Sequence, residues 1–147
     1  MDVPFLQTKE RSVSRATVKD RIRASVRASK DKVFLRGEFD RFGDYRQLSR
    51  AVRELAQDGV LVRVGHGVYC RGRPSTISGQ PVPVETLVTI GLEAMRKLGV
   101  KAELGQEARE LRAGISTQVP VLPIISVGKA RVSRKIGFGT RSIRYES

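Results

Sequence analysis

The sequence predicts an α+β fold, with an N-terminal winged helix-turn-helix followed by a small helix-plus-antiparallel-strand domain. Three observations predict it. Apolar residues recur at helical spacing through 45–57, a glycine-flanked turn interrupts a β-branched stretch at 60–70, and residues 71–83 are rich in glycine, proline and serine. The order helix, turn, helix and hairpin is typical of a winged helix-turn-helix. The expected organisation is a domain at 1–74, a linker at 75–83 and a second domain at 84–147.

The N-terminal segment, residues 1–12, is polar and lacks periodicity, so we expect a frayed arm. A helix is expected to begin near Ser14, because apolar residues then recur every fourth position, at Val18, Ile22 and Val26. Either Ser14 or Thr17 could cap its first turn.

A short apolar run at 33–35 predicts a brief strand or an extended link. Residues 37–42 then predict the first, short helix of the helix-turn-helix, with Phe39 and Phe42 buried. The following Gly43-Asp44 predicts the turn, and Asp44 is well placed to be the N-cap of the next helix.

The helix from Tyr45 to Gln57 is the clearest element. Leu48, Val52 and Leu55 share one face. The opposite face carries Arg46, Arg50, Arg53 and Gln57. The helix is expected to end at Asp58, with Gly59 in the left-handed position that follows a helix.

A β-hairpin should follow, with strands at 60–64 and 68–70 and a tight tip at Gly65-His66-Gly67 that forms the wing. Residues 1–74 are expected to hold a core of their own, made of Val18, Ile22, Val26, Leu35, Phe39, Leu48, Val52, Leu55, Leu61 and Val68.

The second domain should start with a helix at 84–98, whose apolar stripe is Leu87, Val88, Leu92, Met95 and Leu98. A shorter helix is expected at 105–111. Strands are expected at 119–127, where two prolines favour an edge position, and at 130–138 and 141–145.

The charge is strongly positive: 28 Lys and Arg against 15 Asp and Glu give a net charge of +13, with a pI near 10.9. Such a balance favours a nucleic-acid partner, although charge alone does not separate DNA from RNA or an anionic membrane. No apolar run is long enough for a transmembrane helix, and no signal peptide is evident, so we expect no membrane partner. The single cysteine, Cys70, fits a reducing cytoplasm and a structural thiol.

The exposed face of the 45–57 helix is the candidate DNA-reading surface, because arginine and glutamine can each bond a base edge in two places. Residues near its N-terminus are favoured as readers, since that end commonly meets the bases. The alternative is an ordinary solvated basic face. The candidate contacts on this helix are Tyr45, Arg46, Gln47, Ser49, Arg50 and Arg53.

The wing and the residues after it would add phosphate or minor-groove contacts, at Arg63, His66, Arg71 and Arg73. For His66, the simplest interpretation is a loop residue between two glycines. A second basic surface is expected near the C-terminus, from Lys129, Arg131, Arg134, Lys135, Arg141 and Arg144. It could bind nucleic acid or an acidic protein, or it could be the solvent-exposed face of a sheet.

Motifs of enzymes are missing from the sequence, which has no phosphate-binding loop, no zinc-protease pattern and no Ser/His/Asp set. The only histidine, His66, has no cluster of cysteines or carboxylates around it in sequence. We therefore expect no catalytic activity, no metal and no cofactor.

Several blocks resemble a known family. They are Phe34-Leu-Arg-Gly-Glu-Phe39, Gln47-Leu-Ser-Arg-Ala-Val52-Arg-Glu-Leu55 and Gly59-Val-Leu-Val-Arg63-Val-Gly-His-Gly-Val-Tyr69, followed by Gly114-Ile-Ser-Thr-Gln-Val-Pro120. Over about residues 20–145, the chain resembles the AbiEi-type abortive-infection antitoxins, in particular a short plasmid- and phage-borne branch with an N-terminal winged helix. The resemblance implies a type IV toxin-antitoxin system, in which the antitoxin represses its own promoter and its second domain neutralises a nucleotidyltransferase toxin. This chain is shorter than the full-length antitoxins, and the short branch also includes free-standing regulators.

The leading functional prediction is a sequence-specific, DNA-binding transcriptional regulator that represses its own operon. The alternative is an antitoxin or inhibitor whose C-terminal domain binds and neutralises a partner protein such as a nucleotidyltransferase toxin. The expected target is a double-stranded operator with an inverted repeat, bound by a homodimer or by a cooperative pair.

Overall fold

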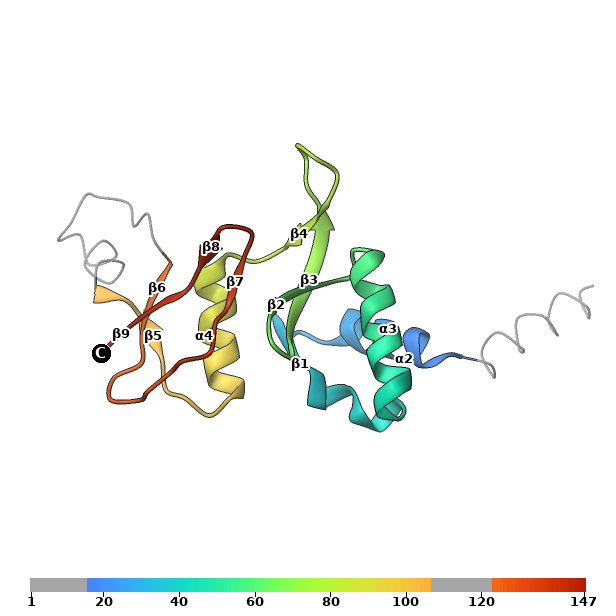
Figure 1. The fold of residues 1–147 in the computed structure, drawn as a ribbon, viewed down its shortest axis with the longest axis horizontal. Helices are drawn as coiled ribbons and strands as arrows, with labels where there is room; N and C mark the ends of the chain where they lie inside the picture. Colours follow the sequence, from blue (N-terminus) through green and yellow to red (C-terminus); the bar gives the residue numbers. More distant parts are fainter. Residues whose placement is uncertain (1–15, 107–122) are drawn as a thin grey trace, which may run out of the picture.

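The computed structural model describes residues 16–106 and 123–147, and its fold is α+β, as predicted. Figure 1 shows a small antiparallel sheet in the middle of the molecule, with strand order β1-β3-β2. Two helices, α2 and α3, lie on one side of this sheet, and α4 with the C-terminal strands lies on the other. The strands are β1 (Val33–Leu35), β2 (Leu61–Gly65) and β3 (Val68–Pro74).

Helix α2 (Val18–Ala28) begins at an N-cap, Thr17, one of the two candidates that the sequence offered. The Asp20 amide donates to the Thr17 hydroxyl over 3.1 Å, and the Thr17 amide donates to the Asp20 carboxylate over 3.2 Å. This reciprocal pair satisfies two amides that a helix start would otherwise leave unpaired. The apolar residues that recur at every fourth position face the interior, and Ile22 and Val26 are fully buried.

The bounds of the two helices expected at 37–42 and 45–57 follow the prediction closely. A 3-10 helix, η1 (Arg36–Phe42), precedes α3 (Tyr45–Gln57), whose bounds are those predicted. Asp44 is the N-cap of α3: its carboxylate accepts from the Gln47 amide over 2.8 Å, and the Gln47 side-chain oxygen accepts from the Asp44 amide over 3.0 Å. Gly59 has φ +79°, so the predicted left-handed residue after the helix is confirmed.

Replacing this cap tests its contribution. Asp44→Ala should lower the free energy of unfolding by about 1 kcal/mol, because the Gln47 amide loses its acceptor at the helix end. Urea unfolding followed by circular dichroism measures the change. Asp40→Ala removes an exposed carboxylate from neighbouring η1 and is the matched control. Equal losses in the two variants would contradict a specific capping role.

The central sheet is covered on both faces because successive strand residues point to opposite sides. Phe34, Leu61 and Tyr69 face α2, η1 and α3. They join a cluster completed by Ile22, Val26, Phe39, Leu48, Ala51, Val52 and Leu55. Seven of its members were predicted: Ile22, Val26, Phe39, Leu48, Val52, Leu55 and Leu61. The predicted Val18 is partly buried against the cluster, whereas the predicted Leu35 and Val68 belong to the other cluster.

The other face of the same sheet forms a second cluster with the C-terminal half. Val33, Val62 and Val68 pack with residues of α4 (Leu87–Lys97), such as Ile90 and Met95. Val64, Cys70, Ala94, Ile125, Val127, Ile136 and Ile143 complete the cluster, and Leu35 packs against it. Residues on both sides of 75–83 therefore share this second core, although the first cluster lies entirely within 1–74.

The predicted linker is also shorter than expected. Residues 81–83 form β4 (Pro81–Pro83), which pairs antiparallel with the end of β3, and the Ser75 amide donates to the Gln80 carbonyl over 2.8 Å. The segment is the tip of a hairpin that projects from the body in Figure 1. Its composition predicted a linker between two domains, whereas the structure has a turn between two paired strands.

The C-terminal strands differ most from the prediction. Strands β5 (Glu103–Leu104) and β6 (Ile124–Ser126) are antiparallel, but β6 and β9 (Arg144–Glu146) are parallel, which corrects the expected all-antiparallel arrangement. Only β7 (Gly137–Phe138) forms in the expected strand 130–138, and it pairs with β8 (Arg141–Ser142).

The rest of 130–136 forms no strand, and side-chain contacts hold part of it in place. The Tyr145 hydroxyl, for example, donates to the Arg134 carbonyl over 2.7 Å. Most of the expected helix at 105–111, and the first part of the strand expected at 119–127, lie outside the described residues.

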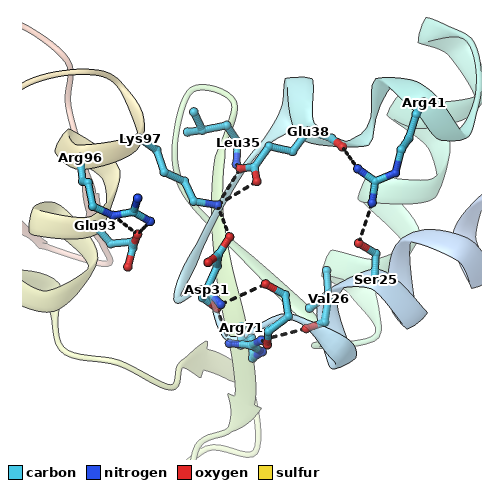
Figure 2. A network of polar contacts seen from close by, with 11 residues as sticks. Ser25, Val26, Asp31, Leu35, Glu38, Arg41, Arg71, Glu93, Arg96 and Lys97 are labelled. Carbon is cyan, nitrogen blue, oxygen red and sulfur yellow. Dashed lines mark hydrogen bonds and ion pairs between the residues drawn. The ribbon is translucent and has the colours of Figure 1, made fainter.

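An ion cluster joins α4 to β1 and η1 (Figure 2). The Lys97 ammonium donates to the carboxylates of Asp31 (2.8 Å) and Glu38 (2.8 and 2.9 Å), and the Glu38 carboxylate also accepts from the Leu35 amide over 2.7 Å. The ammonium lies 5.4 Å from the Phe34 ring centroid. The C-terminal half thus holds the beginning of η1 in position.

No helix in the described ranges is long and apolar enough to cross a membrane.

Candidate nucleic-acid interface

The exposed face of α3 is basic because its apolar residues are all used by the core. Leu48, Ala51, Val52 and Leu55 are buried, which forces the remaining side chains outward. Tyr45 is 77% exposed, although it is a large aromatic residue. The exposed cations of the face are Arg46, Arg50 and Arg53. Among the described residues, no carboxylate forms a salt bridge with these three arginines.

Two of the predicted α3 contacts have other partners. The Gln47 side-chain oxygen already accepts one hydrogen bond, from the Asp44 amide, and this bond fixes the orientation of the side chain while the cap is formed. Bidentate reading of adenine needs that oxygen and the amide nitrogen together. Ser49 is half-buried, donates to the Tyr45 carbonyl over 2.8 Å and accepts from the Arg36 guanidinium. Gln47 and Ser49 therefore support the helix more directly than they present donors or acceptors to a ligand.

Arg36 was not among the predicted site residues, yet it connects three parts of the candidate surface. Its guanidinium lies 4.5 Å from the centroid of the Tyr45 ring and donates to the Tyr45 carbonyl over 3.3 Å. Its backbone amide donates to the Gly67 carbonyl over 2.9 Å. The start of α3 and the β2–β3 turn are thereby held side by side. Sequence spacing carries no signal for this role, because the contacts join residues that only the fold brings together.

The β2–β3 turn carries the next pair of predicted residues, Arg63 and His66, and both are exposed. Arg63 lies between the buried Val62 and Val64, and it points to the same side of the sheet as α3. Its Nε donates to the Gly65 carbonyl over 3.3 Å, which directs the side chain along the turn. Arg73 is also exposed, but it lies toward the opposite end of β3.

Arg71 does not belong to this surface. Its guanidinium is half-buried and donates to carbonyls at the C-terminal end of α2: Val26 over 2.8 Å, Ser29, and then Asp31 over 2.5 Å (Figure 2). Those carbonyls lack partners within the helix, and a cation there also complements the helix dipole. The prediction that Arg71 contacts a ligand is replaced by a structural role.

The basic residues of α2 are partly neutralised. Lys19 and Arg23 form ion pairs with Asp58, over 2.7 and 3.4 Å, and Arg23 also pairs with Asp20 over 3.5 Å. The hydrogen bond from Lys19, together with the charge of Arg23, lowers the pKa of the Asp58 carboxyl. This helix contributes less positive charge to a partner than its composition suggests.

The structure brings part of the predicted C-terminal basic surface beside the β2–β3 turn. Arg134 Nη1 donates to the His66 carbonyl over 2.9 Å. Lys135 and Arg141 line a groove with Arg63 and His66. The other predicted members, Lys129, Arg131 and Arg144, are exposed but do not line this groove.

Cys70 is fully buried in the second cluster, and burial raises the pKa of its thiol to about 12. It is therefore protonated at neutral pH and is a weak nucleophile. Within residues 16–106 and 123–147, no three His, Cys, Asp or Glu side chains gather in a way that could hold a metal ion.

A family model described as a family of unknown function, DUF6088, matches residues 17–147. No curated protein and no solved structure matches the chain.

Proposed function

Because the chain belongs to the DUF6088 family, whose function is unknown, we propose a function from its residues: sequence-specific binding of double-stranded DNA by a winged helix-turn-helix. In this proposal α3 is the recognition helix and enters the major groove, and the β2–β3 hairpin is the wing. The main support for this proposal is the exposed face of α3, where Arg46, Arg50 and Arg53 form no salt bridge with a carboxylate among the described residues.

The position of the β2–β3 turn supports the same proposal. Arg36 connects the turn to the N-terminal end of α3, so Arg63 and His66 lie next to the residues proposed to meet the bases. A duplex with α3 in its major groove would place its adjacent phosphates beside the turn. Tyr45, Arg46 and Arg50 are the proposed base readers.

The proposed biological role is repression of the chain's own operon, through an inverted repeat bound by two copies as a homodimer or a cooperative pair. The resemblance to AbiEi-type antitoxins supports this role. A gel shift with the chain's own upstream region, with and without competitor DNA, tests it. Equal affinity for the upstream region and for random DNA would contradict sequence-specific regulation.

The salt dependence of binding tests whether the basic side chains contact DNA phosphates. The logarithm of the affinity should fall linearly with the logarithm of the salt concentration, with a slope of about −0.9 for each phosphate contacted. The cations of α3, the wing and the first helix, α2, favour about five to eight contacts per protomer. A fluorescence-anisotropy titration over a range of salt concentrations measures the slope. A slope near zero is incompatible with the proposed interface.

Substitutions at base-contacting residues and at phosphate-contacting residues should have different effects on DNA binding. Arg50→Ala should cost about 1–3 kcal/mol on the specific site and relax discrimination at one base position, because arginine reads guanine through two hydrogen bonds. Arg63→Ala or Arg73→Ala should weaken all sequences alike and make the salt slope shallower by about one unit. Competition titrations with specific and random duplexes separate the two classes. If Arg50→Ala weakened both duplexes equally, the reading face would have to lie elsewhere.

A second candidate function is binding of a partner protein, such as a nucleotidyltransferase toxin, by the C-terminal half. The exposed cations Lys129, Arg131 and Arg144 favour it, because they do not line the groove beside the wing. Such a surface would fit an acidic protein face. Co-purification with the product of a neighbouring nucleotidyltransferase gene would support this function. If the two proteins showed no binding, the neutralising role would be excluded for that pair.

A further inference from the structure

A basic groove of about 700 Å³ lies between the β2–β3 turn and the β7–β8 hairpin. Its charged side chains come from two distant parts of the sequence: Arg63 and His66 from the turn, Lys135 and Arg141 from the C-terminal half. The hydroxyls of Thr140 and Ser142 are also in its lining, and no carboxylate of residues 16–106 or 123–147 is. Hydrogen-bond donors and positive charge without any acidic group are the features of a phosphate site.

The walls of the groove are held together by backbone contacts. Arg134 Nη1 donates to the His66 carbonyl over 2.9 Å, which ties the C-terminal segment to the turn. A Cβ atom at Gly65 would come within 2.8 Å of the Lys135 carbonyl oxygen. A Cβ atom at Gly137 would clash with the Arg141 carbonyl in the same way. Glycine at both positions therefore permits the close approach that sets the width of the groove.

The groove is also placed next to the proposed DNA surface. Its Arg63 points to the α3 side of the sheet, and the turn that carries His66 is bonded to Arg36 beside Tyr45. The groove and the start of α3 therefore border the same edge of the molecule.

We propose that this groove binds a backbone phosphate of the same duplex that α3 contacts, so that the C-terminal half is part of the DNA interface. The inference rests on the proposed function and extends it to Lys135 and Arg141. Arg63 and Arg141 supply planar, two-pronged donors, and Lys135 supplies a point charge. The contact adds affinity and fixes the register of the protein on DNA, and it carries no sequence information of its own.

The test compares two double variants that remove the same charge. Lys135→Gln/Arg141→Gln neutralises the groove, and Lys129→Gln/Arg131→Gln neutralises exposed cations of the same region outside it. Affinity for a random-sequence duplex of about two helical turns is measured over a range of salt concentrations. The groove variant should bind about tenfold or more weakly, and its salt slope should be shallower by about two units. The control variant should stay close to the full-length parent chain.

Thermal melting of both variants shows whether they keep the fold. Duplexes carrying a single neutral methylphosphonate, moved along one strand, give a second readout. The parent chain should bind more weakly when the methylphosphonate replaces the phosphate that lies in the groove. At that position the methylphosphonate should not change the affinity of the groove variant. Similar effects of the two double variants, or a groove variant with unchanged affinity and slope, would overturn the inference while leaving DNA binding intact.

Failure of the proposed function can be distinguished from failure of the groove inference, because the parent chain itself would then bind no duplex. A free phosphate ligand is a further outcome that would overturn the inference. In that case, inorganic phosphate would perturb the His66 resonances of the parent chain, and the groove variant would retain the duplex affinity of the parent.

Discussion

A chain that ends at Pro74 is expected to lose its cooperative fold, although it contains η1, α3 and the β2–β3 hairpin in full. The reason is the second face of the central sheet. Val33, Val62, Val64, Val68 and Cys70 would lose their cover of α4 and the C-terminal strands. Burial of a valine-sized side chain contributes about 1.5 kcal/mol or more. Five such losses are comparable to the whole stability of a small domain, about 5–15 kcal/mol.

Thermal unfolding of the 1–74 fragment, followed by circular dichroism, measures this effect against the full chain. A second fragment with Val33→Thr, Val62→Thr and Val64→Thr tests the reason, since threonine keeps the β-branched shape and makes the face less apolar. We expect this fragment to be more soluble than the first. A fragment 1–74 that melted as cooperatively as the full chain would show that the shared core does not stabilise the N-terminal half.

Replacement of Lys97 by methionine is expected to have the next largest effect on stability. The Lys97 side chain is 9% exposed, and its ammonium joins the carboxylates of Asp31 and Glu38. Removal of one partner from a buried ion pair costs about 3–5 kcal/mol. Because the two carboxylates are 42% and 38% exposed, water can partly replace the lysine. A loss of about 2–3 kcal/mol is therefore expected for Lys97→Met.

The pH dependence of this loss has a defined sign. The hydrogen bond and the positive charge of Lys97 lower the pKa of the Asp31 carboxyl below 3.8. Burial opposes the charge of Lys97, but its hydrogen bonds to Asp31 and Glu38 outweigh this effect and raise its pKa above 10.5. A lowered carboxyl pKa adds stability above the unfolded value, and this stability is lost as the pH falls through the folded value. A raised ammonium pKa adds stability below 10.5, which is lost as the pH rises through the folded value.

The difference in unfolding free energy between the parent chain and Lys97→Met should therefore be largest between these limits and should shrink in acid. Urea unfolding at neutral pH and below about pH 3 measures it. Lys101→Met, which removes an exposed lysine from the residues after α4, is the matched control and should change stability little. A difference that stayed constant into acid would mean that Lys97 stabilises the fold through packing and not through its charge.

Local patterns predicted the elements whose hydrogen bonds close within a few residues. The bounds of α3 followed from its apolar spacing, its Asp44 cap and Gly59, and the structure confirms each of them. The β2–β3 hairpin followed from two β-branched runs around a glycine-flanked turn. In such elements, side-chain period and turn chemistry act within one turn or one hairpin, so the sequence contains the relevant partners.

The errors concern contacts between residues far apart in sequence. The segment 75–83 has the composition of a linker, but β4 pairs with β3, and one core includes residues on both sides of it. Strands β6 and β9 are parallel, an orientation that no local pattern encodes. Arg71 is a surface-compatible cation in a basic stretch of sequence, yet it caps α2 through contacts with residues that lie 40 to 45 positions earlier in the chain.

In the candidate interface, too, some features follow from the sequence and others only from the tertiary structure. Composition and helical period alone determined that the chain is strongly basic and that one face of α3 presents arginines, since the opposite face must be buried. The tertiary structure alone decided that Arg36 joins α3 to the β2–β3 turn, and that Lys135 and Arg141 lie beside Arg63. The physical reason is that periodicity specifies which side of an element is apolar, whereas the partner of that side depends on how all the apolar faces are buried together.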